Sequence, residues 1–128
     1  MTVAGIGCRT GAAAEDILAA VQDALAKAGD VRLAALATLA DKCGETGLVS
    51  AARRLGVPLI AVALADMQAV ADRAVTRSAR VADLKGVPSV AETAALAAAG
   101  DGARLIVARI IAGAATCAIA TGGGDTTS

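Results

Sequence analysis

The sequence predicts a three-layer α/β/α sandwich with a mostly parallel sheet and an antiparallel hairpin at its C-terminal edge. Short apolar runs alternate with segments of helical periodicity over residues 2–74, as in folds whose strands are connected by helices. Two further apolar runs near the end of the chain are separated only by a short turn containing glycine, which indicates a hairpin. A sheet of this kind places its ligands at the carboxyl ends of its parallel strands.

The elements follow from periodicity and from their end signals. The run "TVAGIGC" is typical of a buried first strand, and the segment after it has apolar residues at helical spacing up to Gly29. Ser89, with Glu92 three residues later, forms a capping box at a helix start, and Asp66 is the expected cap of an earlier short helix. We expect strands at 2–8, 31–40, 57–65, 104–110 and 116–121, and helices at 12–29, in the segment ending at Gly56, at 66–74 and at 89–100.

The length of 128 residues suits one domain, which we place at 1–121, with a disordered tail at 122–128 and a loop at 76–88. Twelve basic side chains balance twelve acidic ones, so the chain lacks the basic surface of a nucleic-acid binder. The longest apolar stretch is interrupted by Arg109 and is shorter than the roughly 20 residues of a membrane span. We therefore expect neither a nucleic-acid nor a membrane partner.

Two residue classes are missing from the chain. It has no histidine, the commonest general base and a common metal ligand, so we expect no metal site and no cofactor. It has no aromatic residue, so a flat ligand would be held by its edges rather than by stacking. Three cysteines without a Cys-x-x-Cys pair fit a reducing, cytoplasmic compartment.

The loops that follow the first two strands carry the candidate site and should lie at one edge of the sheet. In the first loop, "GIGCRTG" resembles a dinucleotide fingerprint in part, but its last glycine comes one residue late, which favours a structural turn. A helix N-terminus close to Cys8 would lower the pKa of that thiol, although no histidine base accompanies it. The second loop has a charged cluster that either faces Arg9 across a cleft or is a solvated surface pair, namely Asp41, Lys42 and Glu45.

Two further groups allow a structural and a functional interpretation. The capping box explains both Ser89 and Glu92, but a capped helix N-terminus also offers N–H groups to an anion. A basic group around the aperiodic segment can line a lid or simply solvate a loop, and it comprises Arg73, Arg77, Arg80 and Lys85.

Four blocks taken together, "GIGCRTG", "ATLADKCGETGL", "GVPSVAETAAL" and "TCAIA", resemble the family of CobE and the C-terminal domain of CbiG from cobalamin biosynthesis. The resemblance runs from Val3 to Ala120 and implies a role in building the corrin ring. CbiG opens a lactone of cobalt-precorrin-5A, but the chain matches only its C-terminal part, so the stand-alone CobE is the better parallel. The implied partners are a precorrin or corrinoid intermediate and other enzymes of the corrin pathway.

Three functional hypotheses follow. In the first, the protein carries a carboxylate-rich corrinoid that is bound by Gly7, Cys8, Arg9, Thr10, Gly11, Lys42, Ser78, Ser89 and Glu92. In the second, it is a hydrolase in which Asp41 or Glu45 is the general base and Lys42 stabilises an oxyanion. The third is a nucleotide-binding protein.

Overall fold

The computed structural model describes residues 1–75 and 89–122, and the loop expected at 76–88 lies outside these residues. One five-stranded sheet has the strand order β3-β2-β1-β5-β4. The pairs β1–β2 and β2–β3 are parallel, and β5 runs antiparallel to both β1 and β4, which confirms the expected fold class and its terminal hairpin. The strands are β1 Thr2–Cys8, β2 Ala35–Leu39, β3 Leu59–Val62, β4 Arg104–Ala112 and β5 Ala115–Thr121.

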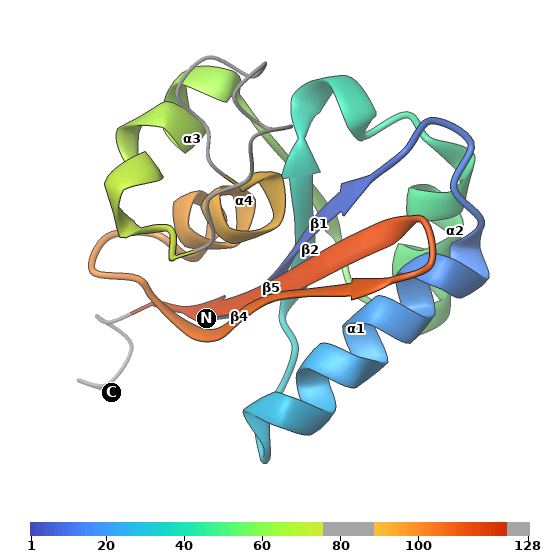
Figure 1. Ribbon diagram of the computed structural model, residues 1–128, viewed down its shortest axis with the longest axis horizontal. Helices are drawn as coiled ribbons and strands as arrows, with labels where there is room; N and C mark the ends of the chain where they lie inside the picture. The colour runs from blue at the N-terminus through green and yellow to red at the C-terminus, as the bar shows by residue number, and fades with distance from the viewer. Residues whose placement is uncertain (76–88, 123–128) are drawn as a thin grey trace.

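Helices cover both faces of the sheet (Figure 1). The helices α1 (Ala14–Ala28) and α2 (Thr46–Leu55) cover one face, where they form the larger part of the core with Ile6 and Leu36. The helices α3 (Leu64–Ala69) and α4 (Val90–Ala99) lie on the opposite face. Short 3₁₀ turns, η1 (Ala40–Lys42) and η2 (Ala71–Arg73), follow β2 and α3.

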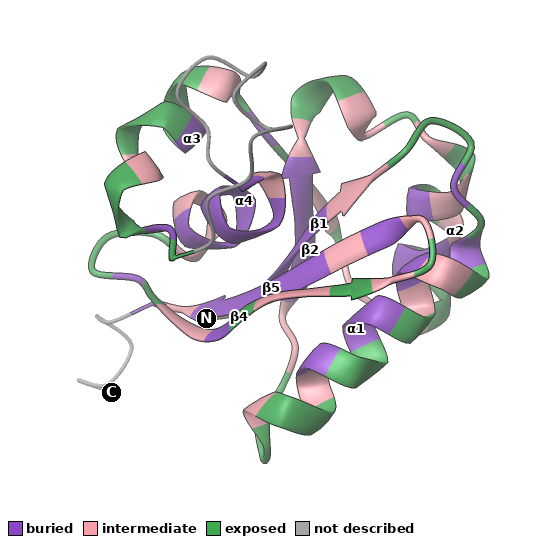
Figure 2. Ribbon diagram, viewed as in Figure 1, coloured by how far each residue is buried: buried purple, intermediate pink, exposed green. Residues whose placement is uncertain are grey.

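The helix α4 packs closely on the centre of the sheet, because small side chains line both surfaces of the contact. Its residues from Ala91 to Leu96 are all buried, and Figure 2 shows this helix and the strands beneath it in the buried colour. A Cβ on Gly5 would lie 1.9 Å from the carbonyl oxygen of Ala91, so only glycine permits this approach. The close contact fixes the N-terminus of α4 beside the end of β1.

The boundaries that differ from the expected ones include the start of β2 and the end of β3. The strand expected at 31–40 begins only at Ala35 and gives way to η1 at residue 40. The run expected as a strand at 57–65 ends at Val62, and α3 begins at Leu64, so Asp66 lies within the first turn and is not the cap. A continuous apolar run suits a buried strand and a buried helix equally well, so periodicity could not locate this change.

In the described ranges, no helix is long and apolar enough to cross a membrane. The amide of Gly122 donates to the carbonyl oxygen of Met1 at 3.0 Å, which attaches the end of β5 to the start of β1. The remainder of the predicted tail, 123–128, lies outside the described residues.

Candidate functional site

A pocket of about 520 Å³ opens at the carboxyl end of β1, on the face of the sheet that carries α4. Its floor is a row of residues from three adjacent strands, since Gly7 of β1 pairs with Thr116 of β5, which pairs with Ile111 of β4. Val90, the first residue of α4, forms the wall next to this row. The pocket is lined by Gly7, Cys8, Arg9, Val90, Arg109, Ile111, Gly113, Ala114, Ala115 and Thr116.

Gly7 keeps the floor of this pocket open. A Cβ at this position would lie 2.7 Å from Oγ1 of Thr116 and 3.6 Å from Cβ of Val90. The hydroxyl of Thr116 donates to the carbonyl oxygen of Gly7 at 3.3 Å and thereby holds the two strands at the floor. Any side chain in place of Gly7 would fill the space and disturb this bond.

Two arginines give the pocket its charge. Arg9 is exposed in the loop after β1, and Arg109 lies on β4. Neither guanidinium has a hydrogen bond or an ion pair with any residue of the described ranges, and the lining includes no acidic residue. In a chain of zero formal net charge, the pocket therefore carries a local positive charge.

Arg109 is the residue of this site that sequence reasoning missed. The sequence presents it only as a break in an apolar run, whereas the structure places it in a β-bulge of the edge strand β4. Its amide donates to Oε2 of Glu92 at 2.9 Å, and the amide of Val75 donates to Oε1 of the same carboxylate, also at 2.9 Å. A charged residue in the interior of an apolar run, shortly before a hairpin turn, was the available signal.

The two expected site loops do come together, but by direct bonds between them. The Nζ of Lys42 donates to Oγ1 of Thr10 at 3.0 Å, and the amide of Gly11 donates to Oε1 of Glu45 at 2.8 Å. Asp41 is exposed on η1. The three charged residues of the second loop are therefore not among those that line the pocket.

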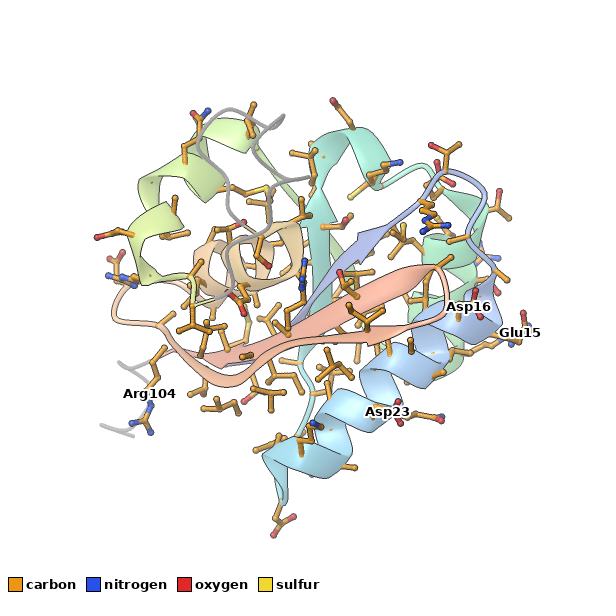
Figure 3. The ribbon with its side chains drawn as sticks, viewed as in Figure 1. Glu15, Asp16, Asp23 and Arg104 are labelled. Atoms are coloured by element: carbon orange, nitrogen blue, oxygen red, sulfur yellow. The ribbon has the colours of Figure 1, made fainter. Side chains whose placement is uncertain are left out.

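The helix N-terminus expected close to Cys8 lies at Ala14, where α1 begins. Figure 3 shows Glu15 and Asp16 on its first turn, beside the turn that joins β4 and β5. The Oδ2 of Asp16 accepts the amide of Ala114 at 3.3 Å, and a bond from the backbone amide of Glu15, with Arg54 nearby, lowers the pKa of the Glu15 carboxyl. These carboxylates place negative charge at the terminus of α1, so it is a poor site for an external anion.

The thiol of Cys8 behaves differently from the sequence-based expectation. Burial raises its pKa, and the charge of Lys42 opposes this rise while that of Glu45 adds to it. The expected fall in pKa required a helix N-terminus next to the thiol, but that terminus lies further along the chain. Cys8 and Cys43 are both partly buried, whereas Cys117 lies in the core.

Ser89, Glu92 and Arg73 are not among the residues that line the pocket. Ser89 caps α4 by accepting the amide of Glu92 at 3.2 Å, which confirms its capping role, and both side chains are fully buried. The guanidinium of Arg73 donates to the carbonyl oxygen of Ala103 at 3.1 Å, so it joins two segments of the fold. Ser78 lies outside the described residues.

Over the described ranges, His, Cys, Asp and Glu side chains do not gather in any group of three that could hold a metal ion. The polar groups that line the pocket are its two guanidiniums, the Cys8 thiol, the Thr116 hydroxyl and the backbone.

Comparison with known proteins gives concordant matches over nearly the whole chain. Residues 2–120 match the family model for the cobalamin synthesis G C-terminus. The Protein CobE of Sinorhizobium sp is 38% identical over 122 residues, which are 92% of this chain and 78% of that protein.

Solved structures agree with these matches. The crystal structure of CobE, a protein from the cobalamin biosynthetic pathway, has a TM-score of 0.85 at 36% identity, over 94% of this chain and 89% of that one. The cobalamin biosynthesis protein chiG from Agrobacterium tumefaciens has a TM-score of 0.75 at 47% identity, over 96% of this chain and 99% of that one. A cobalamin biosynthesis protein G homologue from Sulfolobus solfataricus, at 24% identity and a TM-score of 0.69, shares the fold over 94% of this chain and 36% of its own.

Proposed function

The chain belongs to the family of the cobalamin synthesis G C-terminus and is thus a cobalamin-pathway protein, and on this premise we propose that it binds a carboxylate-rich precorrin or corrinoid intermediate as a carrier or accessory module. The observation that carries the proposal is a pair of guanidiniums, Arg9 and Arg109, which share one pocket without an acidic residue and have no partner among the described residues. A corrin precursor has acetate and propionate groups around its ring, and guanidiniums bind carboxylates through paired, charge-assisted hydrogen bonds.

The open shape of the site supports an edge-on grip. The pocket has no aromatic platform, and its floor of Gly7, Thr116 and Ile111 is small and partly apolar. Arg9 comes from the loop after β1, and Arg109 comes from the opposite edge of the floor on β4. This arrangement suits a ligand that has several carboxylates along one edge and leaves the rest of its ring outside.

The hydrolase hypothesis has less support from the geometry. Glu45, its proposed base, accepts the amide of Gly11 through Oε1, and Lys42, its proposed oxyanion group, donates to Thr10. Both side chains lie outside the lining of the pocket. A nucleotide site has less support as well, because the amides of Arg9 and Gly11 donate to Ala114 and Glu45 inside the protein and do not form an open cradle.

The test is a titration of the purified protein with hydrogenobyrinic acid and earlier precorrins, followed by the visible absorbance of the ligand. We expect saturable binding that weakens about 10- to 100-fold in Arg9→Ala and in Arg109→Ala, the range for losing a charged hydrogen bond. Added salt should also weaken it. The matched control is Arg104→Ala, which removes the same charge from the far end of β4, where Figure 3 shows its side chain.

The fate of the ligand distinguishes the carrier hypothesis from the hydrolase hypothesis. A carrier returns the intermediate unchanged, whereas a hydrolase yields an opened product whose formation Glu45→Gln would abolish while binding persists. Equal losses of affinity in Arg104→Ala and Arg109→Ala would show non-specific attraction and refute the pocket. The absence of any saturable shift in the wild type would refute corrinoid binding altogether.

A further inference from the structure

We infer that Glu92 is a positioning residue, whose buried carboxylate holds the β4 bulge in the conformation that presents Arg109 to the pocket. This inference rests on the proposed function for its consequence in binding, but its structural part is testable in the free protein. It assigns to Glu92 a task that its place in a helix cap does not suggest.

The Glu92 carboxylate is buried and does not line the pocket, so it affects the pocket through the residues that it contacts. Glu92 is fully enclosed by protein, with 0% of its surface accessible to solvent. Burial of a charged group is stable only when hydrogen bonds replace its water. Its two oxygens accept backbone amides from Val75, at the end of the first described range, and from Arg109 on β4.

The bulge explains why Arg109 needs such an acceptor. In the pairing of β4 with β5, Val107 faces Ile119 and Ile110 faces Cys117. Between these pairs, two residues of β4 therefore lie opposite one residue of β5. Such an extra residue interrupts the ladder and redirects the side chain of the bulged strand. Arg109 is one of these two residues of β4, and its amide donates to Glu92. The acceptor therefore comes from α4, and it fixes the backbone from which the guanidinium projects.

The side chain of Glu92 is well placed for this task. It stands on α4, which packs closely against β1 through the contact at Gly5, so its carboxylate is held in relation to the end of β1. Arg9 follows that same strand. Glu92 thus holds the backbone of Arg109 in place relative to the strand that Arg9 follows.

The experiment compares wild type with Glu92→Gln, which keeps the shape but replaces one acceptor oxygen with a donor that cannot accept an amide. Amide hydrogen exchange by NMR should show at least about a tenfold loss of protection at Arg109 or Val75. The affinity for hydrogenobyrinic acid should fall about tenfold, and this fall should vanish when Arg109→Ala is already present, as for two residues acting through one contact. Thr93→Val is the matched control, since it removes a buried hydroxyl bond to Ser89 on the same helix and leaves Glu92 intact.

The outcomes separate this inference from the proposed function. Unchanged protection at both amides in Glu92→Gln, or an equal loss of affinity with and without Arg109, would overturn the positioning role. Failure of the wild type to bind any corrinoid would refute the proposed function and leave the exchange result to decide the role of Glu92. If Glu92→Gln does not fold, Glu92→Asp keeps the charge but is one methylene shorter, and the same loss of protection is expected because it cannot reach both amides.

Discussion

The amide of Gly11 and the carboxylate of Glu45, 34 positions apart in the sequence, are joined by a hydrogen bond of 2.8 Å. Glu45 is the residue that precedes α2, so the bond ties the loop after β1 to the start of that helix. A second bond, from Lys42 to Thr10, joins the same two segments. The turn that the sequence suggests for an external carboxylate therefore holds an internal one.

Glu45→Ala should destabilise the protein by about 1 kcal/mol. A hydrogen bond to a charged group contributes about 1.5–3 kcal/mol when buried, and solvent weakens this one because the bond is exposed. The free energy of unfolding is measured by urea denaturation followed by far-UV circular dichroism, which suits a chain without aromatic residues. The control is Asp41→Ala in the same segment, because the Asp41 side chain is exposed and forms no hydrogen bond within the described part of the chain. Equal losses of stability in the two variants would contradict a stabilising role for the hydrogen bond between Gly11 and Glu45.

Gly5→Ala should be among the most destabilising single substitutions in the protein. Its Cβ would lie 1.9 Å from the carbonyl oxygen of Ala91 and 2.6 Å from the amide nitrogen of Ala95, so α4 would have to move away from the sheet. Overpacking of this kind costs about 1–3 kcal/mol or more. The matched control is Gly44→Ala, because no atom lies within 4 Å of the added Cβ there and the backbone is not in the left-handed region. Thermal denaturation of both variants decides the matter, and a change of similar size in each would contradict the tight contact.

The sequence predicts well whatever depends on neighbouring residues. The cap at Ser89, the end of α2 at Gly56 and the hairpin around Gly113 are local features, and the structure contains all three. Alternating strands and helices similarly place the two loops at one sheet edge.

What the sequence could not predict depends on contacts between distant residues. The acceptor of the Arg109 amide is Glu92, which lies on another element, and the need for it arises from a bulge in the pairing of two strands. A bulge leaves no fixed residue pattern in an apolar strand, so Arg109 looked like an interruption. In the same way, the partner of Gly11 turned out to be Glu45 rather than a ligand, because the loop closes on α2.

Cys8 should react slowly with iodoacetamide, and its reactivity should follow the charge of Lys42. Burial raises the pKa of this thiol and Lys42 partly opposes that rise, so Lys42→Met should move the reaction to higher pH. The measurement is the alkylation rate of each cysteine against pH, with the sites separated by mass spectrometry. Lys42→Arg is the control that keeps the charge, and Cys43 is an internal reference because only burial raises its pKa. A shift of equal size at Cys43 would mean that the substitution has opened the loop rather than removed a charge.

Cys117 should make the protein lose stability as the pH rises above about 9. Burial raises the pKa of this thiol from its ordinary value of 9.0 to about 12, so the unfolded chain ionises first and draws the equilibrium toward unfolding between these values. Below the lower value both states hold the proton and the stability from this group is fully present. For one such group, the free energy of unfolding falls by up to about 1.4 kcal/mol per pH unit between the two pKa values.

The comparison is the free energy of unfolding of wild type and Cys117→Ala from pH 7 to pH 11, in the presence of a reductant. At pH 7 the variant should be less stable by about 1 kcal/mol, because a buried side chain has been shortened in the core that also contains Ile119. As the pH rises above 9, the difference in unfolding free energy should shrink and then change sign before pH 11, since only the wild type loses stability, at up to about 1.4 kcal/mol per pH unit. The chain has no tyrosine, and both proteins share every lysine, so the difference between the curves isolates Cys117. Parallel curves would mean that the thiol ionises as readily in the folded core as in the unfolded chain.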